Sequence, residues 1–322
     1  MVWYTAKLKK ENRHDKLIQL IGKSIAIFIK NAKSRATFAS ADEGVIIVKY
    51  YMMKNIFGLN ENMIILDDME TWGGLLLDLL KKNRSTIFGY FDEEFNIDKQ
   101  AEKDVMLRIN RPKNRFQSDW QNVLSVFNES IKHSIVIGFH CTRLTDFEIT
   151  SIQQDGLDLL NKDRFIKRIK KLKEENLITK PIFEELLNNN NVGDSNRNGM
   201  LWFFHCISTL KDESGLYRLF RRWGGESLYC KHEGESGCNE VLQKIGIPCI
   251  VLGLLSSQDI ESTKTLAERM INFWKESFTI DPTSQDIDTS VSKKVDVFKV
   301  ISIQDPLFPE LTEFSQWSKK IF

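Results

Sequence analysis

Residues 134–157 read SIVIGFHCTRLTDFEITSIQQDGL, and this stretch decides the fold that the sequence predicts. The β-branched run at 135–137 is typical of a buried strand. Apolar residues then recur at helical spacing over 147–152, and Gly156 is the residue type that most often follows the end of a helix. The sequence therefore predicts a strand, a polar cluster and a short helix in direct succession.

The polar cluster offers side chains that suit a ligand. It comprises His140, Cys141, Thr142 and Arg143. An imidazole, a hydroxyl and a permanent cation at the end of a strand suit an anionic ligand that carries a ribose. The alternative is a purely structural cluster at the start of the helix, with Thr145 or Asp146 as the N-cap. Both interpretations fit this segment.

The remainder of the C-terminal half predicts a mixed β-sheet domain with inserted helices. Apolar or aromatic runs indicate strands at 199–209, 247–255 and 295–303, and helices are indicated before residue 188, at 212–222 and at 260–278. The polar segments 188–199 and 281–294 separate these elements. We expect the first to be either a mobile flap over the ligand or a plain surface connection.

Residues 1–130 predict a separate, smaller α+β domain. Helices are indicated at 16–32, 72–80 and 116–131, and short strands at 44–51, 85–91 and 104–110. No constellation of catalytic side chains is visible in this part, so recognition of a substrate or partner is its predicted role. The fold class is thus α+β, with an N-terminal domain over 1–130 and a C-terminal domain over 131–322 that carries the candidate catalytic site.

Composition excludes several classes of function. The 322 residues carry 45 Lys and Arg against 44 Asp and Glu, and a net charge of +1 gives no global attraction to nucleic acid. We expect a cytoplasmic protein without membrane contact, because no apolar run is long enough to span a bilayer and the N-terminus lacks the apolar region of a signal peptide.

The five cysteines do not suggest disulfides or a metal. Their number is odd and no pair has C-x-x-C spacing, which argues against a disulfide framework and a thioredoxin-type centre. Cys230, His232 and Cys238 lie near one another in sequence, but structural zinc sites normally show two tight ligand pairs. No metal is therefore predicted.

The most basic stretch, KDRFIKRIKKLK at 162–173, holds seven cations in twelve residues. Phe165, Ile169 and Leu172 fall at helical spacing, which predicts an amphipathic helix with a basic outer face. One interpretation is a solvated face balanced by nearby glutamates. The other is a row of cations that holds a phosphate backbone beside the active site, which would make the acceptor a nucleic acid.

The C-terminal half resembles the ADP-ribosyltransferase superfamily. The pattern Phe139-His140-x-Thr142-Arg143, followed by Gly156-Leu157, resembles that family's first strand and helix, whose His or Arg holds the ribose and adenosine of NAD. The aromatic strand with Phe203 and Phe204 resembles the second strand, which lies beneath the nicotinamide. The resemblance implies NAD as cofactor, with His140, Thr142, Arg143, Phe203, Phe204 and Trp223 around it.

Glu226 in Trp223-Gly-Gly-Glu is the predicted catalytic acid, beside His140 and Arg143. Cleavage of the nicotinamide–ribose bond passes through an oxocarbenium-like transition state, which a carboxylate stabilises. The glycines let the backbone approach a ligand, and the following residues suggest a strand. Most family members place their glutamate on a late strand, whereas Glu226 would open the third, so Glu310 and Glu313 are alternatives. A tight turn with Trp223 in the core is the structural interpretation.

Three classes of function compete. The first is transfer of ADP-ribose to a macromolecule, either RNA, single-stranded DNA or protein, by a toxin or anti-phage defence enzyme with a possible cognate antitoxin. The second keeps the fold but hydrolyses NAD or transfers an RNA 2'-phosphate to it. The third is a non-catalytic interaction protein, in which the same polar residues only cap and satisfy the core.

Overall fold

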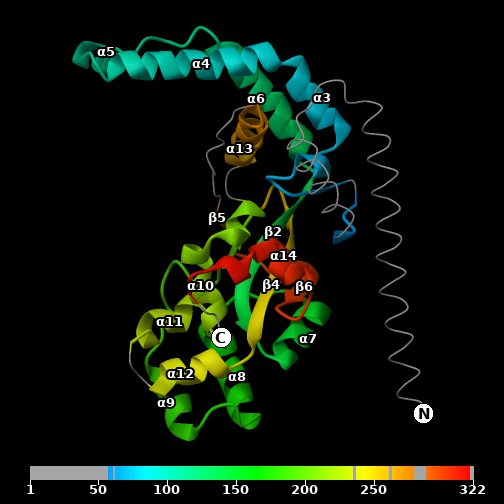
Figure 1. Ribbon diagram of the computed structural model, residues 1–322, viewed down its shortest axis with the longest axis vertical. Coiled ribbons are helices and arrows are strands. Elements are labelled where there is room, and N and C mark those ends of the chain that lie inside the picture. The colour runs from blue at the N-terminus through cyan, green and yellow to red at the C-terminus, as the bar shows by residue number, and fades with distance from the viewer. Residues whose placement is uncertain (1–56, 61, 235–236, 261–262, 279–287, 320–322) are drawn as a thin grey trace. The chain divides into compact units, whose positions relative to one another are not determined.

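The computed structural model describes residues 57–60, 62–234, 237–260, 263–278 and 288–319 (Figure 1). The chain divides into two compact units, Met1–Gly58 and Leu59–Phe322, and nearly all of the described residues belong to the second. The helix predicted at 16–32 and the strand predicted at 44–51 lie outside the described residues.

A six-stranded sheet forms the centre of this unit. Its strands are β1 (Met63–Ile64), β2 (Ile135–Leu144), β3 (Leu201–Phe204), β4 (Ile247–Ser256), β5 (Asp288–Val291) and β6 (Asp296–Ser302). The order is β5-β3-β2-β4-β6, and all of these neighbours are antiparallel, while β1 runs parallel to β2. β2 and β4 pair over their whole length, from Ile135 opposite Ser256 to Leu144 opposite Ile247. Both are almost fully buried, which explains their continuous apolar sequences.

Helices cover both faces of the sheet. On one face, α7 (Asp146–Asp155) packs near β6, and its Ile152 belongs to the same buried cluster as Phe203 and Val300. On the other face, α10 (Glu213–Arg221) contacts β2 and β4, while α14 (Leu307–Thr312) contacts β6. The ring centroids of Phe220 in α10 and Phe308 in α14 lie 5.2 Å apart, so the two helices pack together on this face. α7 ends as predicted, since Gly156 adopts φ 84°.

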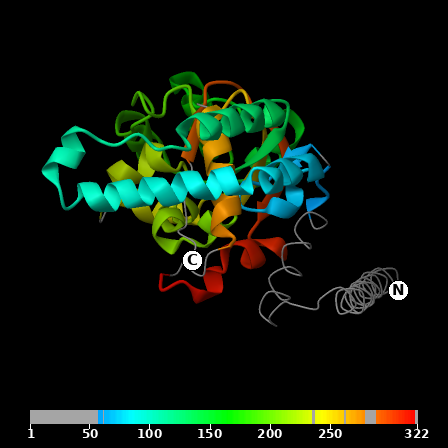
Figure 2. The same cartoon turned by 90° about the horizontal axis from the view of Figure 1, so that it is seen from above.

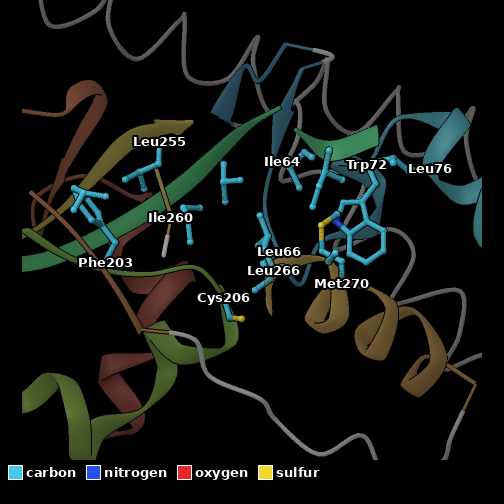
Figure 3. Close-up of a cluster of buried hydrophobic side chains, with 14 of the residues drawn as sticks. Ile64, Leu66, Trp72, Leu76, Phe203, Cys206, Leu255, Ile260, Leu266 and Met270 are labelled. Carbon is cyan, nitrogen blue, oxygen red and sulfur yellow. The ribbon is translucent and has the colours of Figure 1, made fainter. Parts of the chain in front are cut away.

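Within the described residues, the helices before β2 form no sheet of their own. They are α3 (Gly74–Lys82), α4 (Arg84–Ala101), α5 (Val105–Ile109) and α6 (Gln117–Ile131). α3, α4 and α6 contribute to the hydrophobic cluster that includes the sheet, α5 has no buried residue and contacts α4, and α6 also packs on α13 (Thr263–Glu276). Seen from above, α4 lies across this group (Figure 2). One hydrophobic cluster joins Trp72 and Leu76 to Leu266 and Met270 of α13 and to Leu255 of β4 (Figure 3). Residues 59–131 therefore share a core with the sheet, and the chain divides at Gly58 instead of near residue 130.

Two predicted strands in this part are wrong. Residues 85–91 lie within α4, and 104–110 are largely α5. Tyr90 stacks on Trp120 of α6 at 4.9 Å between ring centroids, so the aromatic residues of the first segment serve helix packing. Asp104 caps α5 by accepting a hydrogen bond from the Met106 backbone N–H. The helices predicted at 72–80 and 116–131 are confirmed as α3 and α6.

A second hydrophobic cluster supports the remaining helices. It joins α8 (Lys162–Glu174), α9 (Lys180–Asn188), α11 (Glu226–His232) and α12 (Gly237–Lys244) through side chains that include Phe165, Leu186, Trp223, Leu228 and Leu242. The predicted amphipathic helix at 162–173 is confirmed, with Phe165, Ile169 and Leu172 buried. Strands β4 and β6 and helices α10 and α13 are also confirmed. The strand predicted at 199–209 is confirmed only as the short β3, because a 3-10 helix begins at Ser208. β5 lies where a polar connection was expected.

The fold is thus a mixed α/β sheet domain. Within the described ranges, no helix combines the length and the apolar character that crossing a bilayer requires.

Candidate functional site

A cavity of about 850 Å³ opens beside the ends of β2 and β3. Its walls come from these strands, from α7 and α8, and from the turn that precedes α11. Predicted site residues on its lining are His140, Thr142, Phe203, Phe204 and Glu226. The loop predicted as a flap or a surface connection contributes Asn196 and Arg197 to the wall.

His140 presents a hydrogen-bond acceptor to the cavity. Its Nδ1 lies 2.9 Å from the carbonyl oxygen of Trp202, and because a carbonyl can only accept, Nδ1 carries the proton and Nε2 is the free acceptor of the neutral ring. Burial lowers the pKa of His140, and the nearby positive charge of Arg168 lowers it further against the effect of the Trp202 hydrogen bond. The imidazole is therefore neutral at pH 7.

Thr142 shares the cavity face of β2 with His140, but Arg143 does not. Alternate residues of a strand point to opposite faces, so Arg143 turns towards α10. There it donates from Nε to the Ile245 carbonyl at 2.7 Å and from Nη1 to the Phe220 carbonyl at 3.1 Å, and it is only 5% exposed. Arg143 is not among the residues that line the cavity. The predicted contact of Arg143 with NAD therefore has no support in this geometry.

Phe203 forms the floor of the cavity next to His140. Its ring centroid lies 5.8 Å from that of His140, and the side chain is 1% exposed. The ring can lie flat on the sheet because Gly138 and Gly253, which are opposite each other in β2 and β4, have no side chains beneath it. Phe204 lines the cavity as well, and so does the half-exposed Trp202, which sequence reasoning did not select.

Glu226 lies at the start of a helix, so the predicted strand after it is wrong. Gly224 and Gly225 adopt φ of 87° and 56°, which reverse the chain and direct it into α11. A carboxylate in the first turn is favoured by the helix dipole. Arg197 donates from Nη2 to Glu226 at 2.9 Å and the Tyr229 hydroxyl donates at 3.0 Å. The side chain of Glu226 remains 49% exposed, and these two donors fix its direction.

Trp223 lies behind the cavity wall instead of on it. It is fully buried, and its Nε1 donates to Glu148 at 2.8 Å. The tight turn with Trp223 in the core, which was the structural interpretation of this motif, is therefore the one observed. The same carboxylate accepts from the backbone and hydroxyl of Thr145, both at 2.9 Å, as part of a capping box, and from Nε of Arg168 at 2.7 Å.

Glu148 is therefore a structural acid. Its burial opposes ionisation, but the charge of Arg168 and the hydrogen bonds from Thr145, Trp223 and Arg168 together lower its pKa below the ordinary value. A carboxylate with four donors has little capacity left to bind a substrate. Sequence reasoning missed this group, although Glu148 stands at the third helical position after Thr145, the spacing of a capping box.

Helix α8 presents a row of cations to the cavity. Arg164, Lys167, Arg168 and Lys171 all line it, at the spacing that places residues on one face of a helix. Arg164 pairs with Asp158 and Lys171 pairs with Glu175. The basic helix predicted from the sequence thus has one cationic stripe on the cavity, while Lys170 faces elsewhere and is exposed.

The alternative acids and the candidate zinc ligands lie away from this cavity. Glu310 is exposed on α14 and Glu313 pairs with Lys211. His232 contacts the Asn189 carbonyl through Nε2 at 2.8 Å. Over the part of the chain that the structure describes, no group of three His, Cys, Asp or Glu side chains is arranged to hold a metal.

Comparisons with protein-family models, with curated proteins and with solved structures find no match for this chain. Its function is therefore inferred from the geometry of the cavity and from the resemblance in sequence.

Proposed function

We infer that the protein is an NAD-dependent ADP-ribosyltransferase, with a sheet domain that is a variant of the superfamily fold it resembles in sequence. The observation that carries this proposal is the convergence of His140, Phe203 and Glu226 on one cavity. These residues come from β2, β3 and the start of α11. A volume of about 850 Å³ is within the usual range for small-molecule and cofactor sites.

The groups on the cavity wall suit the parts of NAD. The Nε2 of His140 can accept a hydrogen bond from a ribose hydroxyl, since Nδ1 already donates to the Trp202 carbonyl. Phe203 and Phe204 provide aromatic surface for the nicotinamide ring. Thr142 adds a hydroxyl that can donate or accept on the same wall.

Glu226 has the position and charge to stabilise the transition state. In the reaction the bond between nicotinamide and ribose C1' breaks, neutral nicotinamide leaves with the bonding electron pair, and an acceptor nucleophile bonds to C1' and loses its proton. The carboxylate of Glu226 opposes the positive charge that develops on the ribose. Arg197 and Tyr229 hold it in one direction, which reduces the reorganisation needed when that charge appears.

The partial exposure of Glu226 supports a large acceptor. A side chain that is 49% exposed can be reached from solvent by a nucleophile on a macromolecule. A water molecule would reach it as well, so NAD hydrolysis is the background reaction to measure. The proposed acceptor is therefore a macromolecule, and its class is identified by the acceptor that accelerates nicotinamide release.

The test is release of nicotinamide from NAD by the full chain, with total RNA, single-stranded DNA or lysate protein as acceptor. We expect one acceptor to accelerate release, and Glu226→Gln to reduce it by about a hundredfold or more, as for other losses of preorganised electrostatic stabilisation. Glu310→Gln is the matched control, because it removes the same charge from an exposed position off the cavity. Absence of release with every acceptor, or full activity of Glu226→Gln, would reject the proposal.

A further inference from the structure

In the described part of the chain, Arg168 is held by two contacts that leave its Nη1 and Nη2 groups, the fork of the guanidinium, free to donate hydrogen bonds. Its Nε donates to Glu148 at 2.7 Å, and its guanidinium lies over the ring of Trp223, 4.6 Å from the centroid. Within the described residues, no protein acceptor binds Nη1 or Nη2 of Arg168. The side chain lines the cavity and is 23% exposed. A planar guanidinium fixed in this way is preorganised for two parallel hydrogen bonds to an anionic oxygen pair.

Lys167 supplies a positive charge on the α8 wall of the cavity that is not balanced by a nearby carboxylate of the described ranges. The charge of Arg168 is balanced by Glu148, that of Arg164 by Asp158 and that of Lys171 by Glu175. Lys167 lines the same cavity and is exposed, and among the described residues it has no ion-pair partner. An anion in the cavity could therefore accept hydrogen bonds from Arg168 and be attracted by the positive charge of Lys167, the preceding residue of α8.

The position of Arg168 relative to His140 suggests that one ligand contacts both. Both side chains line the same cavity, and the positive charge of Arg168 contributes to the lowered pKa of His140. His140 suits a ribose hydroxyl and Arg168 suits a phosphate. These groups are neighbours in a nucleoside diphosphate.

We propose that Arg168 and Lys167 form the binding site for the diphosphate group of a nucleotide on the α8 wall of the cavity. This proposal deepens the proposed function by naming the residues that hold the diphosphate of NAD, and it rests on that function for the identity of the nucleotide. Arg168 thereby takes the anion-binding role that the sequence had suggested for Arg143, which faces α10 instead. Glu148 and Trp223 act as positioning residues for Arg168.

The direct test is the affinity of the full chain for ADP and for adenosine, measured by calorimetry. We expect ADP to bind more tightly than adenosine. Arg168→Lys keeps the charge beside Glu148 but loses the fork, and Lys167→Ala loses the uncompensated charge. Each should weaken ADP binding by about tenfold to a hundredfold, the range for hydrogen bonds to charged groups, and leave adenosine binding unchanged.

Lys170→Ala is the matched control, because it removes a cation from the same helix outside the cavity. Lys167 is exposed, so its variant should melt at the wild-type temperature even if substitution of Arg168 lowers stability. Equal ADP affinity in wild type, Arg168→Lys and Lys167→Ala would overturn the assignment. Tighter binding of a single-stranded oligonucleotide than of ADP, with the same dependence on Lys167, would replace the nucleotide by a nucleic acid and overturn it too.

The two proposals fail in distinguishable ways. Glu226→Gln should bind ADP like the wild type, since Glu226 is assigned to the ribose that carries nicotinamide, which ADP lacks. ADP binding that depends on Arg168, without nicotinamide release under any condition, would remove the proposed function and keep the diphosphate site. Nicotinamide release with an unchanged KM for NAD in Arg168→Lys would keep the function and remove this site.

Discussion

Substitution of Gly253 by alanine should force Phe203 out of its place on the sheet. An added Cβ would lie 2.7 Å from Cε1 of Phe203 and 3.0 Å from Cγ1 of Val295. Carbon atoms in contact prefer at least about 3.5 Å, so the ring must shift by roughly 0.8 Å. Phe203 is 1% exposed, and the cavity is the open space that it borders. Overpacking of this kind costs about 1–3 kcal/mol of unfolding free energy.

The strain at Gly253 can be measured by urea denaturation and assigned to Phe203 by a double-mutant cycle. Phe203→Leu shortens the side chain, so Gly253→Ala should cost less in that background, with a coupling energy of about 1 kcal/mol. Gly193→Ala is the control, because its Cβ would meet no atom within 4 Å and its cost should stay within about 0.5 kcal/mol. ADP affinity should fall in Gly253→Ala as the ring enters the cavity. Equal stability of Gly253→Ala and Gly193→Ala would refute this packing argument.

Three further predictions concern other buried or lining groups. His205 is fully buried between the Ile137 carbonyl and the Thr289 hydroxyl, and burial lowers its pKa to about 4. Between that value and the ordinary pKa of about 6.5, the imidazole is protonated in the unfolded chain and neutral in the folded chain. Stability should therefore fall as pH drops from 6.5 to 4, by up to about 3 kcal/mol, and urea titrations of His205→Gln should lack this component. Arg143→Ala should cost about 2–4 kcal/mol in urea denaturation by leaving two buried carbonyls without a charged donor, while the ADP affinity of the folded fraction stays unchanged; a loss of affinity at constant stability would contradict this structural role. Because the pKa of His140 is lowered, its acceptor form prevails at neutral pH, so kcat/KM for NAD should be flat around pH 7 and fall only below the ordinary histidine range; a midpoint above pH 7 would exclude this tautomer as the active form.

The central strands and the helix after β2 could be predicted because each carries a local signal. The apolar runs of β2 and β4 and the capping residues of α7 encode burial and a helix start directly. The aromatic residues in the segment of α4 are compatible with either a strand or a helix. The helix is stabilised by packing on Trp120 of α6, which lies about thirty residues later and leaves no local signal in the segment itself. The helix after Glu226 was missed for a similar reason, since Leu228 packs in a cluster built by α8, α9 and α12.

The cavity shows why a cluster in sequence is not a cluster in space. His140 and Arg143 are three residues apart, but an extended strand places them on opposite faces of the sheet, one on the cavity and the other beneath α10. Arg168 belongs to α8 and is distant from β2 in the sequence. The hydrogen bond from its Nε to Glu148 nevertheless holds its side chain at the cavity that His140 also lines. The cation that the sequence predicted on the strand has its counterpart on the basic helix, where one row of cations lines the cavity and Lys170 lies outside it. Of the two interpretations of that helix, the solvated face fits the stripe with Lys170, and the anion-binding row is the one proposed for the stripe with Lys167. Lys170 on one stripe and Lys167 on the other therefore form the comparison that decides whether the second interpretation holds.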